Sequence, residues 1–222
     1  MPAPSPRPVP LHRYLLLLTA GFAAALVGAL VARHYLHRDL PTPAVADTAV
    51  AAVYATPRPL PPFTLTGHDG SRFDAARLRG HYTLLFFGYT NCPDVCPTTL
   101  LELAQVRRAL ADLPAALQPA VVMVSIDPKR DTNAVLARYV AHFDADFLGV
   151  TGAPEALLAF ATPLGAVFQI GPEVDGRYPV DHTAALFLVD PAVALAAVFP
   201  APHVAKTIAA DYRRILATRG AP

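Results

Sequence analysis

Apolar residues along the chain occur either in continuous runs or at helical spacing, and the two patterns alternate. Continuous runs at residues 82–87 (YTLLFF) and 120–126 (AVVMVSI) predict strands that are buried on both faces of a sheet. Apolar residues three or four positions apart over residues 98–111 and 204–218 predict amphipathic helices. Strands that alternate with helices are typical of an α/β sandwich.

Turn-forming residues complete the predicted architecture. They predict one hairpin between residues 63–66 and 71–73, and a second between residues 184–189 and 193–199. Residues 131–133 are expected to cap a helix that runs to about residue 143. The other expected elements are a short helix at 75–78, a strand at 147–150, a helix at 154–161 and a strand at 167–170 that pairs with later strands. The order of strand, cysteine-bearing loop, helix and strand, followed by a terminal hairpin and helix, predicts a thioredoxin-like sandwich.

Residues 14–32 (YLLLLTAGFAAALVGALVA) form an uncharged apolar run near the start of the chain. The run is close in length to the roughly 20 apolar residues that a membrane-spanning helix needs. It exceeds the apolar stretch of about 7–15 residues in a cleaved signal peptide, and the cleavage-like residues Ala23 to Ala25 lie inside it. We therefore expect an uncleaved N-terminal transmembrane helix, preceded by a short cytoplasmic tail at residues 1–13.

Proline and alanine dominate the segment that follows. Eleven of the 24 prolines precede Phe63, and residues 33–62 are expected to form an extended tether for a thioredoxin-like domain at residues 63–222. Basic residues flank the span on both sides, so the positive-inside rule is nearly balanced. A cysteine pair suits an oxidising space, and no Arg/Ser-rich transit segment precedes the span. We expect a single-pass protein of the bacterial inner membrane whose C-terminal domain lies in the periplasm.

The charge balance gives no sign of a nucleic-acid partner. The chain has 222 residues and a formal net charge of +1, whereas nucleic-acid-binding domains are usually basic. The length is enough for one ordinary domain in addition to the N-terminal segments.

Cys92 and Cys96, the only cysteines, lie four residues apart directly after the first buried strand. Cys92 is expected in the loop and Cys96 at the start of the next helix, so that both sulfurs lie on one side of a helical turn. Unpaired N–H groups and the helix dipole favour thiolates there and predict lowered thiol pKa values. Thiolates can exchange with a disulfide or bind a soft metal ion such as Cu(I).

Other roles for the two cysteines are chemically weaker. Buried apolar cysteines or a structural disulfide remain alternatives, although crosslinking so small a loop adds little stability. Structural zinc usually takes four ligands, and iron–sulfur clusters need more cysteines than the chain has. A peroxiredoxin-like peroxidase is disfavoured because Tyr89 and Pro93, rather than Thr or Ser, lie three residues before the two cysteines.

His182 is the histidine best placed to supply a third ligand. It directly precedes a predicted buried strand, and in a thioredoxin-like sandwich the loop before that strand faces the cysteine loop. A structural role remains the alternative for a lone histidine. Two thiolates and one imidazole suit Cu(I) and can hold Cu(II). A methionine-based copper site is excluded because the chain has only Met123 beyond Met1.

The chain resembles the Sco/SenC family of membrane-anchored copper proteins. The resemblance lies in four segments that follow the family's order: residues 88–100 (GYTNCPDVCPTTL), 125–143 (SIDPKRDTNAVLARYVAHF), 149–152 (GVTG) and 180–191 (VDHTAALFLVDP). It implies a thioredoxin-like fold and copper binding by Cys92, Cys96 and His182. It also implies a role in building the binuclear copper centre, CuA, of cytochrome c oxidase.

Two hypotheses from different classes follow. In the first, the chain delivers copper to the CuA-bearing subunit of cytochrome c oxidase, with other periplasmic copper chaperones or thiol reductants as further partners. In the second, Cys92 and Cys96 are the catalytic redox pair of a periplasmic thiol–disulfide oxidoreductase, which can maintain the oxidase cysteines. The cysteine spacing is one residue wider than the Cys-x-x-Cys of thioredoxins, which favours metal binding.

Overall fold

The computed structural model describes residues 25–28, 48–174 and 178–219. Contacts divide the chain into two units, residues 1–42 and 43–222. In the first unit, residues 25–28 are helical. None of the helices in the described residues has both the length and the apolar character required to cross a membrane. The expected tail at 1–13, most of the expected span at 14–32 and residues 33–47 lie outside the described residues.

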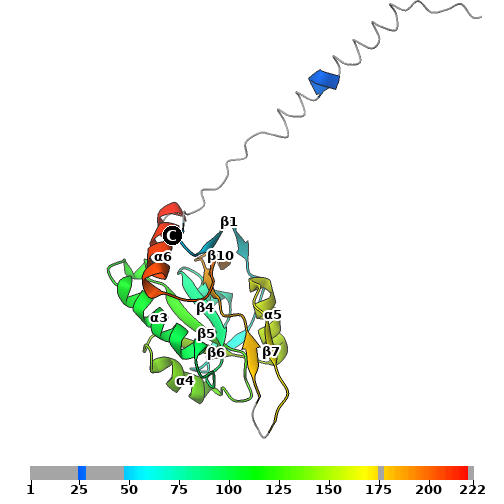
Figure 1. Cartoon of the computed structure of the whole chain (residues 1–222), viewed down its shortest axis with the longest axis vertical. Helices are drawn as coiled ribbons and strands as arrows, with labels where there is room; N and C mark the ends of the chain where they lie inside the picture. Colours follow the sequence, from blue (N-terminus) through cyan, green and yellow to red (C-terminus); the bar gives the residue numbers. More distant parts are fainter. Residues whose placement is uncertain (1–24, 29–47, 175–177, 220–222) are drawn as a thin grey trace, which may run out of the picture. The chain divides into compact units, whose positions relative to one another are not determined.

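The second unit is built on an eight-stranded sheet (Figure 1). Its centre contains the parallel strands β4 (Thr83–Gly88), β5 (Ala120–Ser125) and β6 (Leu148–Thr151). All six residues of β4 are buried, as the continuous apolar run predicts for a strand covered on both faces. The sheet order is β1-β10-β9-β4-β5-β6-β2-β3.

Antiparallel strands flank this centre on both sides. β9 (Leu186–Val189) pairs with β4 and forms a hairpin with β10 (Ala194–Phe199). At the other edge, β2 (Leu65–Gly67) pairs with β3 (Arg72–Phe73) and with β6. Both hairpins predicted from turn residues are therefore confirmed.

Helices cover both faces of the sheet (Figure 1). On one face α3 (Val95–Ala109) packs against α6 (Ala205–Arg219), and α4 (Asn133–Ala141) lies beside α3. On the other face α5 (Pro154–Leu164) places Phe160 against Phe63, Phe73 and Phe87. The short helix α2 (Ala75–Leu78) and a 3-10 turn (Ala115–Leu117) complete the unit. This mixed α/β sandwich has the predicted thioredoxin-like order of elements.

The first strand corrects the predicted domain boundary. β1 (Ala52–Pro59) pairs antiparallel with β10, and the Asp211 carboxylate accepts hydrogen bonds from the N–H groups of residues 49–51. The folded unit therefore includes residues assigned above to the tether, and a boundary at residue 63 is wrong. Prolines 57 and 59 suggested a tether, but β1 is an edge strand, where a missing N–H is tolerated.

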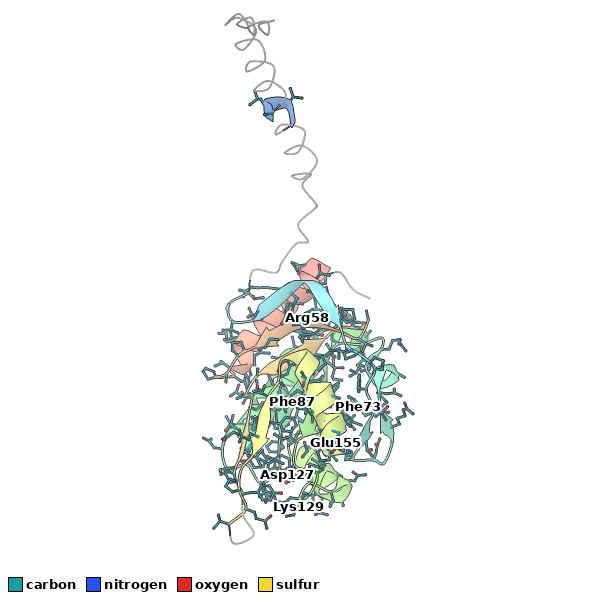
Figure 2. All side chains as sticks on the ribbon, turned by 90° about the vertical axis from the view of Figure 1, so that its right-hand side faces the viewer. Arg58, Phe73, Phe87, Asp127, Lys129 and Glu155 are labelled. Carbon is teal, nitrogen blue, oxygen red and sulfur yellow. The ribbon has the colours of Figure 1, made fainter. Side chains whose placement is uncertain are left out.

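A separate two-stranded ribbon lies beside α5. β7 (Phe168–Ile170) pairs antiparallel with β8 (Val180–His182), so the expected pairing of residues 167–170 with a later strand is confirmed. Figure 2 shows Asp127 and Lys129 at the same end of the domain as this hairpin, and Lys129 Nζ lies 2.7 Å from the Glu173 carboxylate. β8 leads directly into β9 and so carries His182 to the central strands.

Candidate metal centre

The loop between β4 and α3 carries the cysteine pair. Cys92 lies in the loop, and Cys96 lies in the first turn of α3, which begins at Val95, three residues before the predicted start. Pro97 is tolerated there because the N–H groups of a first helical turn have no partner within the helix. Cys96 packs closely on the end of β4: a Cβ at Gly88 would lie only 2.8 Å from its Sγ.

His182 reaches the cysteines because of the strand arrangement. β9 runs antiparallel to β4 and pairs Leu186 with Phe86, so the start of β9 lies beside the end of β4. His182 Nε2 lies 3.6 Å from Cys96 Sγ. The ligand atoms of Cys92, Cys96 and His182 all lie within 4.8 Å of one another. Among the residues that the structure describes, they form the one such group of three metal-ligating side chains.

The hydrogen bonding of His182 determines which nitrogen faces the sulfur. Nδ1 lies 3.2 Å from the Thr183 carbonyl oxygen, which can only accept, so Nδ1 carries the proton and donates it. Nε2 then presents its lone pair to Cys96. Burial lowers the pKa of His182, although the bond to Thr183 opposes the change. The neutral imidazole, which is the form that binds metals, is therefore favoured.

The two thiols differ in their environments. Burial would raise the pKa of Cys92, but the backbone N–H groups of Asp94, Cys96 and Val95 outweigh it and lower the pKa. Burial raises the pKa of Cys96, and the neighbouring Cys92 adds to the increase. The predicted lowering is thus confirmed for Cys92 and wrong for Cys96. The exposed fraction of Cys96 is 1%, and at that depth the helix N-terminus does not compensate for lost hydration.

Sequence reasoning missed the polar residues that surround the centre. Thr132 caps α4 as expected, but Asp131 instead points to Thr90 and Ser125. The Tyr89 ring lies edge-on to His182, with 6.0 Å between the ring centroids. One signal was available: Asp131 follows the second buried strand, and the carboxyl ends of neighbouring parallel strands meet at one sheet edge.

The geometry fits a single soft metal ion. First-row metal ions bind sulfur and nitrogen at about 2.0–2.3 Å, so two ligands of a three-coordinate ion lie about 4 Å apart. The distance of 3.6 Å between Cys96 Sγ and His182 Nε2 already matches this spacing. The 4.8 Å limit on the cluster requires at most a small side-chain adjustment.

Comparisons with known proteins point to one family. The sequence profile described as SCO1/SenC matches residues 54–217. A protein named putative copper-binding protein from Stutzerimonas stutzeri is 37% identical over 150 residues, which cover 67% of this chain and 72% of that protein. The mitochondrial SCO2 homolog of Bos taurus is 38% identical over 130 residues, or 58% of this chain. The match spans only about half (49%) of that relative's length.

Solved structures show the same fold. Copper-bound ScoI of Bradyrhizobium japonicum is 36% identical with a TM-score of 0.63, and the match covers 71% of this chain and 99% of that one. Apo Sco1 of Thermus thermophilus is 34% identical with a TM-score of 0.67, and the match covers 78% and 99%. Copper-bound ScoI of Arabidopsis thaliana is 30% identical with a TM-score of 0.65, and the match covers 70% and 96%.

Proposed function

Because the chain belongs to the SCO1/SenC family and gathers two thiols and a neutral imidazole, we propose that it binds copper through Cys92, Cys96 and His182. The cluster of three ligand atoms within 4.8 Å is the observation that carries the proposal. Copper-bound relatives with 30% and 36% identity support the choice of metal. Two sulfurs and one nitrogen suit Cu(I) and can also hold Cu(II).

The ion is cargo rather than a permanent cofactor in this proposal. Of the two thiols, Cys96 lies deeper in the fold with an exposed fraction of 1%, while Cys92 lies in the loop and retains an exposed fraction of 9%. A recipient protein can therefore approach the centre from the Cys92 side and take the ion by ligand exchange. By family resemblance, the recipient is the CuA-bearing subunit of cytochrome c oxidase, and the process is assembly of that enzyme.

We also propose that residues 14–32 anchor the chain in the bacterial inner membrane, with the folded unit in the periplasm. The support is the uncharged apolar run and the cysteine pair, which suits an oxidising space. The chain should stay in the membrane fraction after alkaline carbonate washing, and protease added to spheroplasts should digest the folded unit. Release by carbonate would refute the anchor, and protection in intact spheroplasts would refute the orientation.

Metal analysis of the full chain tests the copper proposal. The purified reduced chain, kept in mild detergent, is given copper and desalted, and copper per chain and visible absorption are measured. One ion per chain is expected, and Cu(II) should give a thiolate-to-copper charge-transfer band. His182→Ala should lose both signals while its thiols still oxidise to a disulfide.

His203→Ala is the matched control. His203 is also partly buried, and burial lowers its pKa as it does for His182, but its Nδ1 lies near Thr99 rather than near a sulfur. This variant should bind copper like the wild type. Tight binding of one copper ion by His182→Ala would show that the three-ligand site is wrong.

The thiol arrangement also supports a second candidate, a thiol–disulfide reductase. Cys92 has the lowered pKa and the greater exposure, so its thiolate would attack a partner disulfide and form a mixed disulfide. Cys96 would then attack Cys92 Sγ and release the partner as a dithiol, leaving this chain oxidised by two electrons. Absence of copper binding together with a readily cycled Cys92–Cys96 disulfide would favour this candidate.

A further inference from the structure

The two cysteines are held in place by different means. Cys96 belongs to a helix, and its sulfur packs against Gly88. Cys92 lies in the loop of residues 89–94, between β4 and α3, and its sulfur faces the N–H groups of residues 94–96 at the start of α3. Its own N–H donates only within the loop, to the Tyr89 carbonyl at 3.3 Å. The position of the Cys92 backbone therefore depends on what holds the loop.

Asp131 binds this loop through two hydrogen bonds to one residue. The backbone N–H of Thr90 donates to Oδ2 at 2.9 Å, and the Thr90 hydroxyl donates to Oδ1 at 2.6 Å. Because a main-chain and a side-chain donor of the same residue meet the two carboxylate oxygens, both the position and the direction of the backbone at Thr90 are fixed. Cys92 follows two residues later.

The Asp131 carboxylate is itself rigidly supported. It is fully buried, and its Oδ2 also accepts a hydrogen bond from the Ser125 hydroxyl at 2.6 Å. Ser125 Oγ in turn accepts the N–H of Asp127 at 3.2 Å. All three donors face the carboxylate, whereas an amide in its place has one accepting oxygen and replaces the charge-assisted hydrogen bonds with weaker neutral ones. These bonds connect the end of β5 to the loop that follows β4.

We propose that Asp131 is a positioning residue, which through Thr90 holds Cys92 in reach of an ion bound by Cys96 and His182. The inference rests on the proposed copper site and adds a residue whose hydrogen bonds go to Thr90 and Ser125 rather than to a ligand atom. Loss of a residue that orients a metal ligand typically costs 10–100-fold in metal affinity. Asp131→Asn should therefore raise the dissociation constant for Cu(I) by about 10–100-fold.

Asp211→Asn is the matched control for lost stability. Asp211 is also a fully buried carboxylate, and it accepts three backbone N–H groups, but they belong to residues 49–51 beside α6. In the full chain, Cu(I) affinity is measured by competition with a chromophoric Cu(I) chelator, and the melting temperature is measured without copper. Both variants should have a lower melting temperature than the wild type, and only Asp131→Asn should lose Cu(I) affinity.

Amide hydrogen exchange of the copper-free chain gives a second, metal-independent readout. Asp131→Asn should speed exchange at Thr90 and Cys92, because the loop opens more often without its anchor. Asp211→Asn should leave these two amides unchanged. This measurement separates the positioning role from the proposed function: a wild-type chain that bound no copper would refute the copper site, while exchange would still test Asp131.

Thr90→Val keeps the inference testable if Asp131→Asn does not fold. It removes the hydroxyl bond to Asp131 Oδ1 and a longer one to Asn91, and it keeps the N–H bond to Asp131 Oδ2. A smaller loss of affinity is therefore expected. Combined with Asp131→Asn it should add little, since the two changes act on one link. Unchanged Cu(I) affinity and unchanged amide exchange in Asp131→Asn and Thr90→Val would overturn the positioning role. An equal loss of Cu(I) affinity in Asp211→Asn would overturn it as well.

Discussion

Replacing Gly88 with alanine should disturb the proposed copper site, because the added methyl group would press on the Cys96 sulfur. Gly88 ends β4 and has no positive φ angle, so alanine can adopt its backbone conformation. A Cβ at this position would lie 2.8 Å from Cys96 Sγ and 3.0 Å from the Phe86 ring. The effect of Gly88→Ala is therefore steric, and it acts first on a sulfur that we assign as a ligand.

The size of the effect follows from these distances. Non-bonded heavy atoms are comfortable at about 3.5–4.0 Å, so the Cys96 sulfur must retreat by about 0.7–1.2 Å. Functional sites generally tolerate displacements of only about 0.5 Å. We expect copper affinity to fall at least about 10-fold, which corresponds to about 1.4 kcal/mol. Overpacking should also lower the free energy of unfolding by about 1–3 kcal/mol.

Gly152→Ala separates the site effect from overpacking. A Cβ at Gly152 would also meet a neighbour at 2.8 Å, but that neighbour is Leu65 Cδ2. Cu(I) competition, the visible spectrum of the Cu(II) form and melting temperatures should be compared for both variants. Both variants should have a lower melting temperature than the wild type. Only Gly88→Ala should lose copper affinity and shift the charge-transfer band. Wild-type affinity in Gly88→Ala, or an equal loss in Gly152→Ala, would refute the reasoning.

Two further predictions concern the N-terminal part of the folded unit. Burial alone would raise the pKa of Asp211, but the N–H groups of residues 49–51 and the Arg214 guanidinium lower it below 3.8. The carboxylate's contribution is therefore present above the unfolded-state pKa and lost as pH falls through the lower folded value. Asp211→Asn should lower the free energy of unfolding by roughly 1.5–3 kcal/mol at pH 7, measured by urea titration. This difference between wild type and variant should become smaller below about pH 4; a difference that does not change with pH would contradict the assignment. A chain that starts at residue 63 instead of 43 loses β1, and its melting temperature, measured by circular dichroism, should be at least about 4 °C lower. Equal melting temperatures would show that β1 does not stabilise the fold.

The central architecture was predictable because its sequence signals are local. β4 and β5 appear as continuous apolar runs, since strands covered on both faces have no polar side. The β9–β10 hairpin appears as two apolar runs around a turn. With those strands placed, topology brings the segment before β9 to the cysteine loop, so the approach of His182 to Cys96 could be predicted without coordinates.

The features that were missed depend on long-range contacts or on burial depth. The prolines in β1 are untypical of a strand, and only its pairing with β10 identifies the segment as one. The link from Asp131 to Thr90 joins residues 41 positions apart, and no local pattern distinguishes that aspartate from a helix cap. The direction of the pKa shift at Cys96 depends on how deeply the first turn of α3 is buried, and the spacing of the two cysteines does not reveal this depth.

The different supports of the two thiols predict different behaviour when each is disturbed. Cys96 is set by helix and strand packing, so Gly88→Ala moves a rigid ligand and should change the spectrum and the affinity without changing amide exchange in the loop. Cys92 is set by the Asp131–Thr90 link, so Asp131→Asn frees a loop and should speed exchange there. In the proposed copper carrier, this division would let Cys96 keep the site formed while Cys92, the more exposed of the two thiols, is exchanged. Identical responses of both variants in affinity, spectrum and exchange would show that the two sulfurs are held as one rigid unit.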